Sequence, residues 1–231
     1  MLTLILAESA LETIPKNLWR HTAVKRYSKK HRKPPQLIVL DRSYHHAAMK
    51  TLSESDKRGR PDIVHFVLLE ALGSPLNKER LLQVYVHTLN NHVISVKPET
   101  RLPRNYSRFV GLMEQLFKLG RAPPNGKALL KLESKTLSQL LSEINPTYVV
   151  GFSTAGTPYT IEEVTSRLSN EEKPVVIIGG FPHRHFSAVT LQLVDKLVRI
   201  DSEMLEASTV TSRVIYEYER AISLPMKRLK R

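Results

Sequence analysis

Short apolar runs, separated by polar segments that contain glycine or proline, organise the chain. In the first part, the runs at 3–7 (TLILA) and 34–41 (PPQLIVLD) predict two buried strands. Two alternating runs, 82–89 and 92–96, flank Asn90-Asn91, and this arrangement is typical of a β-hairpin. The first part of the chain therefore predicts two buried strands and two strands of a hairpin.

Two helices are predicted around the hairpin. Residues 61–72 (PDIVHFVLLEAL) carry proline at the first helical position and are followed by Gly73. This segment is apolar nearly all round, so we expect it to be buried or to lie in an interface. A second helix is expected from about 103 to 119, where an apolar run begins at Phe109.

From about residue 129 the pattern changes to alternating strands and helices. The runs at 147–152, 174–180 and 196–200 are short, apolar and rich in β-branched residues, and each precedes a helical segment. Short buried strands that alternate with helices predict an α/β fold, with a mostly parallel sheet flanked by helices. The last helix is marked by apolar positions three and four residues apart: Ala207, Val210, Val214, Tyr218 and Ala221.

Three segments that follow these strands are candidates for a shared binding pocket: 151–156 (GFSTAG), 178–186 (IGGFPHRHF) and 200–208 (IDSEMLEAS). Ligands of parallel α/β sheets bind outside the carboxyl ends of the strands. The pocket is no known phosphate cradle, because residues 120–128 (GRAPPNGKA) fail the P-loop spacing. His183 and His185 lack a third ligand, so we predict no metal site.

The charge balance points to a polyanionic partner. The 231 residues include 35 Lys and Arg against 22 Asp and Glu, a formal net charge of +13. Nucleic acid is the leading candidate, and an anionic membrane surface is the weaker one. Residues 16–33 hold eight Lys or Arg and no acid. They form either a solvated loop or a nucleic-acid surface on which Trp19 and Tyr27 stack bases.

Cysteine is absent, which excludes disulfides and Cys-ligated zinc and suits a reducing, cytoplasmic compartment. The N-terminus lacks the basic start of a signal peptide, and no apolar run is long enough to span a bilayer. We therefore expect no membrane-spanning segment, and we predict nucleic acid rather than a membrane as the partner.

Arginines gather at two predicted helix starts. Arg101, Arg104 and Arg108 surround the start of the helix expected near 103, where Arg104 and Arg108 would share a face. Three guanidiniums beside a positive helix terminus favour phosphate binding over a merely solvated face. Arg60 precedes the helix at 61, with Asp62 in its first turn. Asp62 either complements the helix dipole or holds or activates a group beside Arg60.

Four motifs together resemble a known family. Residues 59–79 (GRPDIVHFVLLEALGSPLNKE), 86–116 (VHTLNNHVISVKPETRLPRNYSRFVGLMEQL), 151–153 (GFS) and 178–183 (IGGFPH) are similar to the small-subunit ribosomal RNA pseudouridine-N1 methyltransferases, a SPOUT-class family of ribosome biogenesis. The chain looks like the archaeal type. The resemblance implies one SPOUT domain over 1–231, with a hairpin-containing extension at roughly 55–120 and a C-terminal trefoil knot at roughly 145–225.

The resemblance also implies an activity, a cofactor and site residues. It implies a homodimer that uses S-adenosylmethionine (SAM), without metal, to methylate N1 of a pseudouridine in small-subunit ribosomal RNA. Arg60, Arg101, Arg104 and Arg108 match RNA-contacting arginines, and Asp62 would orient Arg60 or act as general base. The matched cofactor positions are Thr154, Gly179, Arg184, Ile200, Asp201, Ser202, Glu203, Met204 and Leu205.

Two alternatives to this activity stay open at the level of sequence. A non-enzymatic assembly factor could use the same surface to bind RNA. A metabolic α/β enzyme with an anionic substrate is the third class, and the basic segment and the arginines count against it. In related sequences the last loop often carries a Pro-Leu step, where this chain has Met204-Leu205.

Overall fold

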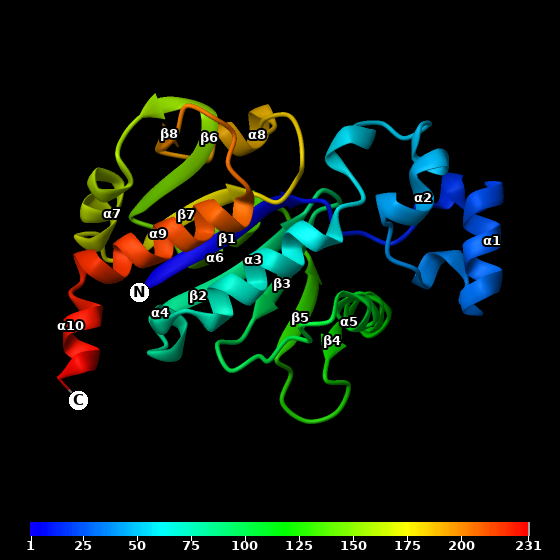
Figure 1. Cartoon of the computed structure of the whole chain (residues 1–231), viewed down its shortest axis with the longest axis horizontal. Helices are drawn as coiled ribbons and strands as arrows, with labels where there is room; N and C mark the ends of the chain where they lie inside the picture. The colour runs from blue at the N-terminus through cyan, green and yellow to red at the C-terminus, as the bar shows by residue number, and fades with distance from the viewer. Residues whose placement is uncertain (231) are drawn as a thin grey trace.

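The computed structural model describes residues 1–230, which form a sheet flanked by helices (Figure 1). The eight strands have the order β4-β5-β3-β2-β1-β7-β6-β8. Five strands, β2, β1, β7, β6 and β8, are parallel to one another. The other three, β3, β5 and β4, add an antiparallel edge, and this mostly parallel sheet confirms the prediction. The strands are β1 (Leu2–Ser9), β2 (Leu82–Thr88), β3 (His92–Val96), β4 (Arg121–Ala122), β5 (Leu130–Ser134), β6 (Tyr148–Pro158), β7 (Pro174–Gly179) and β8 (Lys196–Arg199).

Strand β1 lies in the middle of the sheet and is buried along its whole length. Leu4 and Leu6 pack into the core on one face, whereas Ile5 and Ala7 pack into the core on the other. This two-sided burial explains the continuous apolar run, because a central parallel strand has no solvent face. Each fully buried leucine or isoleucine stabilises the fold by roughly 1.5–3 kcal/mol.

Helices cover both faces of the sheet unequally. Side chains of α3, α5, α7 and α9 build the larger core, whereas α6 covers the opposite face. Within residues 1–230 no helix is long and apolar enough to cross a bilayer. The helices around the sheet are α3 (Pro61–Gly73), α4 (Pro75–Lys78), α5 (Tyr106–Leu119), α6 (Leu137–Ile144), α7 (Ile161–Ser169), α8 (Ala188–Leu191), α9 (Ala207–Ala221) and α10 (Leu224–Leu229).

Residues 14–52 form a small helical module with its own apolar core, which includes Leu18, Val24 and Leu40. The strand predicted at 34–41 is wrong: Pro34 and Pro35 begin a 3-10 turn, and the segment contributes a single isolated bridge. The helices in and beside the module are η1 (Lys16–Leu18), α1 (Thr22–His31), η2 (Pro35–Leu37), α2 (Arg42–Met49) and η3 (Ser55–Lys57).

The helix predicted from about 103 begins three residues later, at Tyr106. The Asn105 side chain accepts a hydrogen bond from the Arg108 amide at 3.1 Å and caps the helix. Asn is a much better N-cap than the residues before it. Arg104 therefore precedes the helix, and the prediction that it shares a helical face with Arg108 is wrong.

The segment predicted as a loop at 151–156 belongs to β6 instead. Phe152 and Thr157 both pair with Val198 of β8, so the intervening residues form an excursion within the strand. The trefoil knot and the homodimer stay predictions.

Candidate functional site

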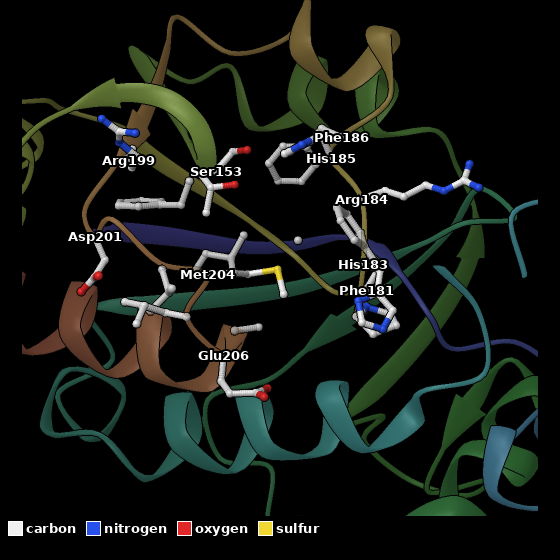
Figure 2. Close-up of a pocket in the computed structure, with 18 of the residues that line it drawn as sticks. Ser153, Phe181, His183, Arg184, His185, Phe186, Arg199, Asp201, Met204 and Glu206 are labelled. Carbon is white, nitrogen blue, oxygen red and sulfur yellow. The ribbon is translucent and has the colours of Figure 1, made fainter. Parts of the chain in front are cut away.

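A pocket of about 230 Å³ lies at the carboxyl end of the parallel pairing between β6, β7 and β8 (Figure 2). The three strand-end segments predicted to share a pocket all contribute to it, and so do α3 and α9. The lining residues are 152–154, 178–179, 181–186, 198–201, 203–207, Arg60, Ile63 and Val210.

The segment from Phe181 to Phe186 supplies two aromatic walls. The two rings meet edge to face, with centroids 5.6 Å apart. The end of this segment is held by Glu8, which lies near the end of β1. One Glu8 oxygen accepts hydrogen bonds from the Ser187 amide at 2.8 Å and from the Thr190 hydroxyl at 2.7 Å.

Lys57 contacts both Glu8 and Phe181. We call this set of contacts, made by Glu8 and Lys57 to the pocket segment, the clamp. The Lys57 Nζ lies 2.7 Å from the second Glu8 oxygen and 4.5 Å from the centroid of the Phe181 ring. The Lys57 and Glu8 side chains are only 3% and 6% exposed. Burial alone raises the pKa of Glu8, but the hydrogen bonds from Lys57, Thr190 and Ser187 outweigh it, so the pKa lies below its ordinary value. The Glu8 side chain is therefore a carboxylate, and its hydrogen bonds to Ser187 and Thr190 fix the end of the pocket segment to β1.

The segment after β8 forms the opposite wall. Asp201 accepts a hydrogen bond from the Glu203 amide at 3.1 Å and pairs with Arg213 of α9 at 3.4 Å. The Glu203 amide first, and Arg213 second, hold the pKa of Asp201 below its ordinary value. Met204, which is 64% exposed, reaches toward the middle of the pocket in Figure 2.

Gly179 lies where a side chain would disturb this arrangement. A Cβ atom at Gly179 would approach the Phe181 ring to 2.9 Å, closer than real contacts allow. At Gly180 a Cβ atom would come within 2.3 Å of the Ser9 hydroxyl. Both glycines therefore permit close packing at the end of β7, and only Gly179 borders the pocket.

Arg60 lies at the rim of the pocket, at the start of α3. Its Nε and Nη2 donate to the two Asp62 oxygens at 2.9 and 2.8 Å, which forms a bidentate pair. The hydrogen bond to Asp62 raises the pKa of Arg60. The side chains are 36% and 28% exposed, so the guanidinium retains faces that can meet a ligand.

The other three predicted arginines are exposed on the segment that packs beside α3. His65 of α3 donates through Nε2 to the Pro103 carbonyl at 2.7 Å, and its ring stacks on Phe109 at 4.3 Å. These contacts hold the segment that includes Arg101, Arg104 and Arg108 against the second turn of α3, the helix that begins directly after Arg60. The four predicted arginines, which we call the arginine cluster, therefore lie on two segments that contact each other.

The predicted cofactor residues also come together, except one. The pocket is lined by Thr154, Gly179, Arg184 and, of the predicted residues 200–205, by all except Ser202. The Arg184 side chain points away from the pocket in Figure 2 and pairs with Asp56. Arg184 can therefore meet a ligand through its backbone. Among residues 1–230 no group of three His, Asp or Glu side chains could hold a metal ion.

Sequence reasoning missed the parts of the site that lie far apart in the chain. Phe181 and Phe186 carried a signal, because aromatic residues stood in a segment already predicted to line the pocket. Glu8 and Lys57 carried none, because an acid at the end of an apolar strand and a lysine in a polar loop are ordinary patterns.

The residues of the pocket fit SAM. Aromatic walls at Phe181 and Phe186 suit a purine ring, and backbone groups at the strand ends suit its polar edges. The carboxylates of Asp201, Glu203 and Glu206 suit hydroxyl groups and a cationic sulfonium.

Fold and site together define an α/β methyltransferase, with Arg60 at the rim of its cofactor pocket. The family model described as EMG1/NEP1 methyltransferase matches residues 4–219, and the chain belongs to that family.

Relatives match along nearly the whole chain. The ribosomal RNA small subunit methyltransferase Nep1 of Thermococcus kodakarensis is 47% identical, over 97% of this chain and 100% of its own. The protein of the same name from Pyrococcus furiosus is 47% identical, over 94% and 96%. The crystal structure of Archaeoglobus fulgidus Nep1 bound to S-adenosylhomocysteine has a TM-score of 0.85 and 40% identity, and it covers 96% of this chain and 98% of its own.

Proposed function

We propose that this protein methylates N1 of a pseudouridine in small-subunit ribosomal RNA and uses SAM as the methyl donor. The observation that carries the proposal is the position of Arg60. It lines the cofactor pocket and directly precedes α3, the helix against which the segment with the exposed arginines of 101–108 packs, so it links the two parts of the site in this proposal. The names of the relatives and the S-adenosylhomocysteine in the related crystal structure support the same activity.

Each part of the site has a role in this reaction. SAM supplies an electrophilic methyl group on a sulfonium. The walls at 181–186 and 200–206 hold the cofactor, and the arginines bind RNA phosphates so that N1 lies close to the methyl group and in line with it. Positioning of this kind supplies a large part of the rate in reactions between two substrates.

Asp62 orients Arg60 in this proposal. Both carboxylate oxygens accept hydrogen bonds from the guanidinium, a geometry that fixes its plane. The alternative is that Asp62 accepts the N1 proton. The bidentate pair favours the orienting role, because a base would need an oxygen free to meet the substrate.

A direct test is mass spectrometry of an RNA loop after incubation with the protein and methyl-labelled SAM. The matched control is the same loop with uridine in place of pseudouridine, because the N1 of uridine is bonded to the sugar and carries no proton. We expect methylation of the pseudouridine loop alone. Equal labelling of both loops, or of neither, would refute the proposed target.

We also propose that the chain works as one domain and as a cytoplasmic homodimer. Exposed apolar side chains such as Phe66 on α3 (56%) and Tyr216 on α9 (56%) support an interface on these helices. Light scattering should give twice the chain mass. The mass of one chain at micromolar concentration would contradict the dimer.

A further inference from the structure

The basic segment 16–33 is not explained by the site described above. These residues carry a net charge of +8, whereas the whole protein carries +13. Within residues 1–230, only Lys33 of this group has an ion-pair partner, whereas cations elsewhere on the surface often pair with nearby acids, as Lys131 does with Glu133 and Lys135 with Glu143. Such a concentration of unpaired charge attracts polyanions.

Four of these eight charges stand on α1, so the segment is not a solvated loop throughout. Val24 of α1 is fully buried in the core of the module, which fixes the orientation of the helix. Trp19 and Tyr27 pack against that core, and the Trp19 indole donates to the Ile14 carbonyl at 2.8 Å. This packing accounts for the two aromatic residues, and base stacking by them stays a prediction. Their role is to hold the basic face in place.

The outward face of α1 is purely cationic. Lys25 and Lys29 are four residues apart, and so are Arg26 and Lys30, and all four are exposed. Like charges at this spacing destabilise a helix. A face that costs stability in the free protein is explained by a partner that neutralises it.

The module is fixed to the helix that carries part of the arginine cluster. Glu114 of α5 pairs with Lys33 and accepts a hydrogen bond from the Val39 amide at 3.3 Å. Tyr106, in the first turn of α5, donates to Asp41 at the start of α2. Figure 1 shows the module at the end of the molecule where α3 begins, opposite α10. The basic face of α1 is thus held in a fixed position relative to α5, which carries Arg108 of the arginine cluster.

We propose that the exposed face of α1 binds RNA phosphates that flank the nucleotide held at the pocket. This inference rests on the proposed function and adds a second RNA surface to it. A membrane surface fits α1 less well, because a helix lying on lipid needs an apolar face to insert. The apolar face of α1 is used inside the module, and α1 exposes no large apolar side chain.

The test replaces Lys25, Arg26, Lys29 and Lys30 with Gln and measures RNA affinity. Glutamine favours helices and removes the repulsion, so the fold is expected to survive. The control replaces Lys78, Arg80, Lys227 and Lys230 with Gln, which removes the same charge at the opposite end. The RNAs are the target loop alone and a hairpin in which the loop carries its flanking stem.

For the hairpin, the α1 variant should bind at least tenfold more weakly than the control. Its slope of log affinity against log salt should fall by about 0.9 for each lost duplex phosphate contact. Its affinity for the loop alone should match that of the control. A second variant, with arginine in place of Lys25, Lys29 and Lys30, should restore hairpin affinity.

Equal hairpin affinities for the α1 variant and the control would overturn the inference. An equal loss on the loop alone would also overturn it, because the face would then contact the target rather than its flanks. If α1 serves a membrane, the variant loses binding to phosphatidylserine vesicles and keeps its hairpin affinity. Failure of the proposed function gives a different result, because the wild-type protein would then transfer no methyl group to the loop.

Discussion

Two ion pairs near the pocket have nearly the same length and opposite surroundings. Glu8 and Lys57 are 2.7 Å apart and almost fully buried, whereas Arg60 and Asp62 are 2.8 Å apart and about one-third exposed. A buried charge must keep its partner, because water cannot replace it. An exposed guanidinium can bind its carboxylate and a phosphate together. The comparison separates residues that hold the pocket from residues that are free to meet a ligand, which in the proposed function is RNA.

The largest expected effect comes from breaking the buried pair. Lys57→Met leaves the Glu8 carboxylate buried without its cation, which typically costs about 3–5 kcal/mol. The matched exposed variant, Arg60→Met, should cost at most about 1 kcal/mol. Urea denaturation of both variants measures the difference. Adding Glu8→Gln to Lys57→Met should recover part of the loss, and equal costs for the two single variants would contradict the comparison.

A second change tests whether the clamp serves the cofactor pocket. Gly179→Val should displace the Phe181 ring, which lies 2.9 Å from the position of the new Cβ and covers Lys57. We expect affinity for S-adenosylhomocysteine to fall at least tenfold, which corresponds to about 1.4 kcal/mol, with RNA affinity retained. Calorimetry measures the affinity for S-adenosylhomocysteine, and an RNA-binding assay on the same variant measures the affinity for RNA. Parallel loss of both affinities would make Gly179 a purely structural residue.

A double-mutant cycle sharpens the role of the exposed pair. Asp62→Asn should weaken RNA binding severalfold, and Arg60→Ala on top should add little, because the pair acts as a unit. If Asp62 is instead a general base, Asp62→Asn keeps RNA affinity and lowers single-turnover methyl transfer about a hundredfold or more. Additive losses of RNA affinity would contradict the orienting role.

The smallest effect is a dependence of stability on pH. The pKa of Glu8 is lower in the folded protein than its ordinary 4.5, so the unfolded chain binds protons more readily in this range. The contribution of Glu8 to stability is therefore present above pH 4.5 and lost as the pH falls through its folded pKa. Glu8→Gln should show a shallower loss of stability below pH 4.5 than the wild type. An identical slope would show that other carboxylates carry the effect.

Much of the fold was predictable because its signals are local. The strands at 82–88, 92–96 and 174–179 and the helices at 61–73 and 207–221 follow from periodicity and from proline and glycine at their ends. Two of the three errors in the fold have local causes as well. A pair of prolines turned the expected strand at 34–41 into a 3-10 turn, and Asn105 moved the start of α5.

By itself, the sequence determined the class of fold, the positive charge, the strand-end segments of the pocket and the positions of the arginines, because each depends on neighbouring residues or on totals. The tertiary structure alone decided which of these residues meet. Glu8 and Ser187 are 179 residues apart, Glu8 and Lys57 are 49 apart, and His65 and Pro103 are 38 apart. No periodicity records such contacts, since they form only when packing brings distant segments together and burial makes their hydrogen bonds obligatory.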